Sequence, residues 1–278
     1  MLRYRVLTAV LLAPLVLWIV WLAPEGLLPP AFAAVALLGA WEWAQFMGLR
    51  QAVARFAYVA VIAAAIAVSW IYLRAGWPSL PVILSAVAWW VFVFVWLYRF
   101  SKQPTAVEPP PWVTAVIGLV TLVPAWFAVV QMHRVGGAEG AYWVTLLLVL
   151  VWGSDVAAYF SGKAFGRHKL APRLSPGKTW EGAAGGMIIG LLLAGGFHWA
   201  ASAVGIGPER VNWYLLLPVA AATIVFGIVG DLFESMLKRR CGVKDSGGIL
   251  PGHGGILDRI DALVAAAPVL AIGLLAGT

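Results

Sequence analysis

Long apolar runs alternate with short polar connections along the whole chain of 278 residues. At a rise of about 1.5 Å per residue, a helical run of about 20 apolar residues crosses a hydrocarbon layer of about 30 Å. Nine runs approach or reach this length, at residues 6–23, 28–48, 54–73, 80–98, 112–131, 141–160, 183–205, 213–235 and 261–276. The pattern therefore predicts an all-α, polytopic integral membrane protein with about nine transmembrane helices.

The basic residues of the connections predict how these helices are oriented. Every second connection between the predicted helices is basic. These basic connections contain Arg50, Arg55, Arg99, Lys102 and the segments 163–178 and 238–259. The connections between them hold only Arg74, Arg134 and Arg210. Since short connections rich in Lys and Arg stay in the cytoplasm, we expect a cytoplasmic N-terminus and an outside C-terminus. The first run follows Arg3 and Arg5 as a signal peptide does, but the eight later runs favour a retained anchor.

Composition supports the membrane assignment and narrows the class of partner. The chain is 62% hydrophobic and 11% charged, whereas soluble domains are about 45–50% apolar. Ten of the nineteen Lys and Arg residues lie in the two basic segments, and all five aspartates lie in the second half. This clustering argues against a nucleic-acid surface and favours loops that face anionic headgroups or a phosphorylated ligand. The single cysteine, Cys241, excludes an internal disulfide.

The two halves of the chain differ in their polar content. Residues 1–135 are expected to form the N-terminal transmembrane helices, and residues 136–278 a catalytic transmembrane region with cytoplasmic loops at 161–182 and 236–260. Glu42 is the exception in the first half, near the cytoplasmic end of the second run. An intramembrane carboxylate is a functional hypothesis by default, although Glu42 could instead neutralise a basic residue of the catalytic half.

The first basic segment contains groups suited to binding phosphate. Asp155 precedes it within an apolar run, and a helix is expected to begin near Trp180. Glycines, prolines and basic side chains can surround phosphate oxygens, and a helix N-terminus favours anions. The candidates are Lys163, Arg167, Lys169, Arg173, Ser175, Lys178 and Thr179. An ordinary positive loop remains the alternative, and the sequence SPGKT lacks the earlier glycine of an ATP-binding P-loop.

The second basic segment combines carboxylates with cations at two helix ends. Asp231, Glu234 and Lys238 share one helix face, and Asp258 and Asp261 share another. Glu234 and Lys238 are also spaced as an ordinary helical ion pair. Carboxylates that converge in this way suit Mg²⁺, which takes one or two protein carboxylates together with water and substrate phosphates. A loop whose charges only pair with one another is the alternative.

The segment also resembles the signature of the phosphatidate cytidylyltransferases, the CDP-diacylglycerol synthases, of the bacterial type. The matching positions are Ser235, Lys238, Arg239, Lys244, Asp245, Pro251, His253, Gly254, Gly255, Asp258, Arg259 and Asp261. The upstream stretch GKAFGRHKLAPRLSPGKTWEG is similar to the same family's loop. One departure is that Val156 and Ala157 follow Asp155, where the family usually has a small hydroxyl residue and glycine.

This resemblance implies that CTP and phosphatidic acid react at the cytoplasmic side of the inner membrane to give CDP-diacylglycerol and pyrophosphate, with Mg²⁺ as cofactor. A second cation and a homodimer are left open, and no nucleic acid is expected. The implied metal ligands are Asp231 and Asp258 first, then Asp155, Asp245 and Asp261. The remaining implied catalytic or phosphate-binding residues of the signature are Ser235, Lys238, Arg239, Lys244, His253 and Arg259.

Other functions would share some of these features. A transporter or lipid flippase would show internal repeats and charges near the bilayer midplane, whereas these charges lie at the cytoplasmic ends of the predicted helices. A transferase acting on polyprenyl phosphate, or a lipid kinase that uses CTP, would share the metal, phosphate and lipid features. Only the signature argues against these last two.

Overall fold

A computed structural model describes residues 2–24, 26–102, 109–208, 212–249 and 254–277. The first half forms five long helices, α1 (Leu2–Trp21), α2 (Leu28–Phe46), α3 (Ala52–Arg74), α4 (Leu80–Lys102) and α5 (Pro111–His133). The second half contains α6 (Gly137–Leu148), η1 (Val149–Gly153), α7 (Ser154–Phe165), β1 (Lys169–Ala171), β2 (Ser175–Thr179), α8 (Trp180–Ala203), α9 (Trp213–Arg240) and α10 (Leu257–Gly277). The all-α prediction is confirmed.

Each apolar run of the sequence corresponds to one long helical segment. Prolines in the first turn of α2 and α5 fit helix starts, where a backbone donor is not needed. Asn212 caps α9 by accepting a hydrogen bond from the Tyr214 N–H at 3.0 Å. Six helical segments of the described chain are long and apolar enough to cross a membrane. The multi-pass character is thereby supported, while the count of nine and the orientation stay predictions.

Helices from both halves of the chain meet around α10. This helix packs most extensively on α9 and also on α5 and α4. Phe233 of α9 lies among four tryptophans of the first half, with ring centroids 5.7–6.4 Å apart: Trp43, Trp89, Trp90 and Trp96. Such aromatic contacts fix the rotation of α9 about its own axis. The carboxylates and the lysine that neighbour Phe233 on α9 are positioned by the same packing.

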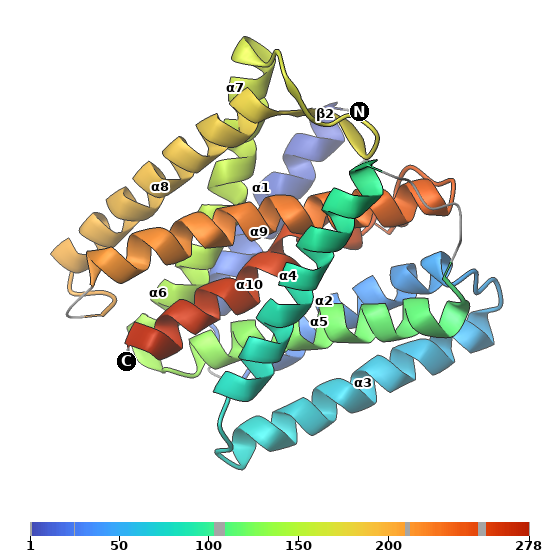
Figure 1. Cartoon of the computed structure of the whole chain (residues 1–278). Coiled ribbons are helices and arrows are strands. Elements are labelled where there is room, and N and C mark those ends of the chain that lie inside the picture. Colours follow the sequence, from blue (N-terminus) through green and yellow to red (C-terminus); the bar gives the residue numbers. More distant parts are fainter. Residues whose placement is uncertain (1, 25, 103–108, 209–211, 250–253, 278) are drawn as a thin grey trace.

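The polar segments gather at one end of this bundle. In Figure 1, the hairpin β1–β2, the C-terminal end of α9 and the N-terminal end of α10 lie at the end opposite to the C-terminus. The hairpin is antiparallel, with Lys169 opposite Thr179 and Ala171 opposite Ser175. The sequence predicted a loop here, because a stretch containing Pro176 and Gly177 gives no alternating strand pattern. The hairpin holds the basic residues in a fixed arrangement beside the helix ends.

Close helix packing brings these ends together. A side chain at Gly186 of α8 would lie 2.8 Å from the Ser154 carbonyl oxygen of α7. A side chain at Gly230 of α9 would collide with the Asp261 backbone and lie 3.0 Å from Ala265 of α10. Glycine at these two positions therefore lets α7 approach α8, and α9 approach α10, at the level of the polar residues.

A π-helical turn interrupts the helix that leads to Asp155. The segments α6, η1 and α7 form one continuous helix, and its π-turn ends immediately before Ser154. A π-turn adds one residue to a helical turn and thereby shifts the direction of every later side chain. Hydrophobic periodicity alone predicted a regular helix over 141–160, so the sequence did not reveal this shift.

Candidate active site

A pocket of about 520 Å³ lies between the hairpin and the ends of α7, α8, α9 and α10. Its charged lining consists of Asp155, Lys163, Lys178, Asp231, Asp258, Arg259 and Asp261. Smaller polar groups and backbone come from Ser175, Thr179 and three glycines. Part of the wall is apolar and consists of Ala158, Ala183 and Ile228. Residues of two predicted loops and of four predicted helix ends thus face one cavity.

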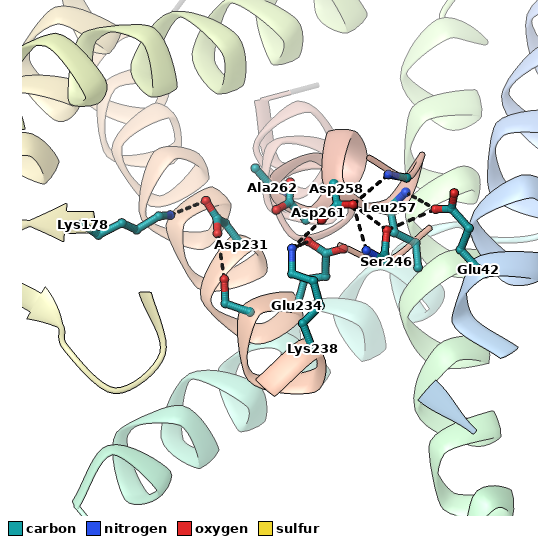
Figure 2. Close-up of polar contacts among 12 residues, drawn as sticks. Glu42, Lys178, Asp231, Glu234, Lys238, Ser246, Leu257, Asp258, Asp261 and Ala262 are labelled. Carbon is teal, nitrogen blue, oxygen red and sulfur yellow. Dashed lines mark hydrogen bonds and ion pairs between the residues drawn. The ribbon is translucent and has the colours of Figure 1, made fainter. Parts of the chain in front are cut away.

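A lysine of the hairpin reaches a carboxylate of α9 across this pocket. Lys178 Nζ lies 2.5 Å from Asp231 Oδ2, and the two side chains are 24% and 30% exposed (Figure 2). Ser235, one turn further along α9, donates a long hydrogen bond of 3.4 Å to the other oxygen of Asp231. Because both charged groups remain partly accessible, a ligand entering the pocket can contact either of them.

A second lysine, Lys238, lies between two carboxylates about two turns further along the same face of α9. Its Nζ is 2.9 Å from Glu234 Oε2 and 2.5 Å from Asp258 Oδ1. The three side chains are at most 15% exposed, so this is a nearly buried ion triad. The helical pair expected between Glu234 and Lys238 is confirmed, and Asp258 joins it from α10.

The other oxygen of Asp258 is held by backbone and hydroxyl donors. Asp258 Oδ2 accepts hydrogen bonds from the Ser246 N–H at 2.9 Å, the Ser246 hydroxyl at 2.9 Å and the Gly255 N–H at 2.8 Å. Donors to an ionised carboxylate favour its charged form. Asp258 is therefore fixed in place by the loop that precedes its own helix.

Two further carboxylates face the same cavity. Asp155 lies within electrostatic reach of Lys178 and Asp231. Asp261 interacts with Asp231, Glu234 and Lys178 and accepts a hydrogen bond from the Ala262 N–H at 2.8 Å. Together with Asp231 these groups concentrate negative charge in a pocket that is also lined by Lys163, Lys178 and Arg259.

This donor set fits a hard divalent cation that shares its ligands with substrate. Asp155, Asp231 and Asp261 line one pocket and supply the oxygen donors that Mg²⁺ prefers. Within the described ranges, no group of three or more His, Cys, Asp or Glu side chains is placed so that it could hold a metal ion by itself. That is expected of Mg²⁺, which retains waters and binds substrate phosphates.

Comparison with known protein sequences relates nearly the whole chain to one family. The family model described as "Cytidylyltransferase family" matches residues 3–276 of the chain. The chain belongs to the cytidylyltransferase family. Its relatives include the phosphatidate cytidylyltransferase of Pseudomonas aeruginosa, 42% identical over 274 residues, which are 98% of this chain and 96% of that protein. The phosphatidate cytidylyltransferase of Haemophilus influenzae is 36% identical over 281 residues, covering 96% of each.

The family prediction made from the signature is therefore confirmed, and the match extends beyond the signature. A third relative, the phosphatidate cytidylyltransferase of Brucella suis, is 35% identical over 274 residues, covering 97% of this chain and 92% of that protein. The sequence alone showed the resemblance only in the second half of the chain. The match to the cytidylyltransferase family thus covers the first half of the chain as well as the half that forms the pocket.

Several of the residues predicted to bind phosphate do line the pocket, and others have structural contacts outside it. Lys163, Ser175, Lys178 and Thr179 are lining residues. Thr179 also caps α8, because its hydroxyl accepts from the Gly182 N–H at 3.1 Å. Arg173 donates to the Ser101 carbonyl oxygen at 2.9 Å, and Arg167 and Lys169 are exposed outside the lining. The predicted phosphate-binding residues that line the pocket thus come from α7 and β2, and β1 contributes only Leu170 to the lining.

The signature residues are divided in the same way. Asp231, Asp258, Arg259 and Asp261 line the pocket. Arg239, Lys244 and Asp245 are exposed at the same end of the bundle without being part of the lining. Lys238 is part of the buried ion triad, and Ser235 donates to Asp231. His253 lies outside the residues that the structure describes.

Sequence reasoning missed Glu181, which fixes the chain just before the hairpin. Its carboxylate accepts hydrogen bonds from the Arg167 N–H at 3.1 Å and the His168 N–H at 3.1 Å, and it contacts His168 Nδ1 at 2.6 Å. A carboxylate in the first turn of a helix that follows a basic loop is a recognisable signal for such a contact. Glu181 has this position in the sequence, since it lies in the stretch KTWEG at the start of the helix that follows the basic segment.

Proposed function

We propose that this protein transfers the cytidylyl group of CTP to phosphatidic acid, giving CDP-diacylglycerol and pyrophosphate for phospholipid synthesis. Family membership and the names of the full-length relatives support the reaction class and the two substrates. The observation that carries the proposal to particular residues is the pocket in which Lys178 meets Asp231 beside Asp155 and Asp261. Cations and carboxylates in one cavity suit a substrate that carries several phosphates.

The reaction joins two phosphates without a covalent enzyme intermediate. A phosphate oxygen of phosphatidic acid attacks the α-phosphorus of CTP, the bond from that phosphorus to the bridging oxygen breaks, and pyrophosphate leaves. A phosphate monoester is already largely ionised near neutral pH, so no strong general base is required. Catalysis then depends on positioning the two phosphates in line and on neutralising their charge.

Each wall of the pocket has a part in this proposal. Lys178 and Arg259 bind phosphate oxygens, and Lys163 and the backbone around Gly177 extend that surface. Ala158, Ala183 and Ile228 form the wall that accepts the apolar glycerol end of the lipid. Lys238 holds Asp258 in position from behind the pocket. A phosphorylated lipid can thus lie with its headgroup on the charged side and its chains toward the helices.

Magnesium is the proposed cofactor. When bound, it neutralises phosphate charge and orients the triphosphate. Asp231, Asp155 and Asp261 are the residues that would hold it. Asp231 is 30% exposed in the pocket and would exchange its contact with Lys178 for the cation, whereas Asp258 is 9% exposed and both its oxygens are engaged by Lys238 and by loop donors. Asp258 remains a proposed ligand only if Lys238 is displaced. Asp245 is exposed outside the lining and is a weaker candidate.

We place the pocket at the cytoplasmic side of the inner membrane. The two basic segments that form it are those that the positive-inside rule assigns to the cytoplasm. CTP is a soluble cytoplasmic nucleotide, whereas phosphatidic acid lies in the bilayer, so a site at a helix end gives access to both. A homodimer also stays a proposal.

The test is incorporation of labelled cytidine into lipid by the purified protein in detergent, with phosphatidic acid, labelled CTP and Mg²⁺. We expect lipid-soluble label and equimolar pyrophosphate from the wild type, and at least a 100-fold lower rate from Asp231→Asn and Lys178→Ala. Glu139→Gln is the control, since this carboxylate contacts Trp143 at 3.3 Å on α6, away from the pocket. Transfer of γ-phosphate with release of CDP, or labelling of polyprenyl phosphate alone, would reject the proposal.

A further inference from the structure

Glu42 of α2 contacts the loop residue Ser246 and the first residue of α10, Leu257, although more than 200 residues of sequence separate them from it. Glu42 Oε2 accepts hydrogen bonds from the Leu257 N–H at 2.9 Å and from the Ser246 hydroxyl at 3.2 Å (Figure 2). Glu42 is 3% exposed and Ser246 is fully buried. The described side chains provide no cation within ion-pair distance of Glu42, so it does not neutralise a basic residue of the second half there.

The position of this carboxylate suits the start of α10. Leu257 is the first residue of the helix, and its N–H has no acceptor within its own helix. A carboxylate at a helix N-terminus satisfies such a donor and interacts favourably with the helix dipole. Glu42 therefore caps α10 from another helix, in a buried environment where the interaction is weakly screened.

Ser246 links Glu42 to the pocket. Its hydroxyl lies 3.2 Å from Glu42 Oε2 and 2.9 Å from Asp258 Oδ2, while its N–H donates to the same Asp258 oxygen. One hydroxyl proton is thus placed between two carboxylates. Any movement of Glu42 changes the donors that hold Asp258, which in turn lies against Lys238.

The loop backbone is shaped to fit around Glu42. A side chain at Gly247 would collide with the carboxyl group of Glu42, and its three nearest neighbours are all atoms of Glu42. The backbone angle φ of Gly247 is not positive, so a clash with Glu42 is what prevents an alanine there. At Gly248, by contrast, an added side chain would meet nothing within 4 Å, and φ is again not positive.

We propose that Glu42 is a positioning residue for the reaction: it fixes Ser246, Gly247 and the start of α10, and thereby places Asp258 at the pocket. This assigns the N-terminal half of the chain a direct part in forming the active site. The role of Glu42 in catalysis rests on the proposed cytidylyl transfer, but its role in fixing the loop does not. Glu42 itself is absent from the pocket lining and touches no substrate.

The test is a double-mutant cycle between Glu42→Ala and Gly247→Ala, with Gly248→Ala as the matched control. Removing Glu42 leaves two donors without their acceptor and lets the loop move, and a displacement of about 1 Å lowers rates by about 100-fold. We expect kcat to fall about 10- to 100-fold in either single variant, with KM for both substrates changed less than about threefold. Lys178 and the α7–α8 side of the pocket, which bind substrate, are unaffected.

The decisive outcome is the coupling between the two sites. In the Glu42→Ala background, the added methyl group of Gly247→Ala occupies space that the carboxyl group has left. In that background Gly247→Ala should therefore lower kcat by less than about twofold. Adding Gly248→Ala should change kcat by less than about twofold, both in the wild type and in the Glu42→Ala variant. Equal losses from Gly247→Ala in both backgrounds, or wild-type kcat in either single variant, would overturn the proposal.

Hydrogen exchange gives a readout that does not depend on the substrate. Peptides covering 241–260 should exchange at least about tenfold faster in Glu42→Ala than in the wild type, while peptides covering 154–185 stay unchanged. If the wild type showed no cytidylyl transfer, the proposed function would fall and this comparison would still decide the positioning role. Unchanged exchange in 241–260 would reject it.

Glu42→Gln keeps the test decisive if Glu42→Ala does not fold. In the place of Oε2, the amide oxygen can still accept from the Leu257 N–H and the Ser246 hydroxyl, and the NH₂ group replaces Oε1, which accepts no hydrogen bond from the described residues. The substitution therefore removes mainly the negative charge at the helix start, and hydrogen bonds to a charged acceptor are the stronger ones. We expect folded protein with kcat about 3- to 10-fold below wild type, unchanged KM and partial loss of protection in 241–260. Glu42→Gln and Gly247→Ala variants that both had wild-type kcat and exchange would exclude the role.

Discussion

Replacement of Lys238 by methionine removes the cation from a nearly buried triad. The Glu234 and Asp258 side chains are only 5% and 9% exposed, and Lys238 Nζ is within 2.9 Å of an oxygen of each. Methionine fills a similar volume but leaves two carboxylates facing each other without a counter-charge. Asp261 interacts with Glu234 and with Asp231, so these two carboxylates add to the negative charge around the unpaired pair.

The expected cost follows from the burial of these groups. Breaking a buried ion pair by removing one partner destabilises a protein by about 3–5 kcal/mol, because the remaining charge is uncompensated. For soluble proteins of 150–250 residues, each kcal/mol lowers Tm by about 2–4 °C, so we expect a decrease of at least about 6 °C. Lys238→Arg keeps the positive charge, so its Tm should fall by less than half as much as that of Lys238→Met.

Thermal unfolding of the purified protein in one detergent measures this effect, with Lys244→Met as the control at an exposed position of the adjoining loop. The double variant Lys238→Met, Glu234→Gln removes one of the two unpaired charges and should be more stable than Lys238→Met alone. A Tm of Lys238→Met within 2 °C of the wild type, or a further loss in the double variant, would contradict the buried triad.

Three further results are expected. Asp155→Asn should raise the Mg²⁺ concentration for half-maximal transfer by about 10-fold or more, since it removes one of about two or three carboxylates available to the cation; an unchanged Mg²⁺ titration would exclude it as a ligand. EDTA should abolish transfer and added Mg²⁺ should restore it, whereas full activity in EDTA would reject a metal requirement. Gly186→Val should separate α7 from α8 and lower Tm by several degrees, while Gly196→Val, whose side chain would meet nothing within 4 Å, should not; equal effects would contradict the close packing.

The helices could be predicted from the sequence because membrane-spanning runs differ so much from their connections. The run predicted at 80–98, for example, is α4 at Leu80–Lys102, and that at 213–235 is α9 at Trp213–Arg240. Helix ends extend further than the apolar runs, because Lys238 and its neighbours continue α9 as polar residues. Hydropathy predicts the part of a helix that is apolar, and not where its hydrogen bonding stops.

The candidate site was predictable only as far as spacing along one helix allowed. The pair between Glu234 and Lys238 follows from helical periodicity, whereas the ion pair between Lys178 and Asp231 joins residues of separate elements. The contact of Glu42 with Ser246 spans 204 positions, and no local pattern encodes it. An intramembrane carboxylate signalled that Glu42 had a function, but only the packing of α2 beside α10 shows its partner.

The π-turn at Val149–Gly153 makes the number of residues in this stretch as important as their identity. Each residue of an α-helix turns the chain by about 100°, so deleting one residue to restore a regular helix would rotate Asp155 away from the pocket by about that angle. The apolar character of the stretch would survive such a deletion unchanged. Substitutions between aliphatic side chains should therefore be tolerated here during evolution, whereas a change of length by a single codon should not.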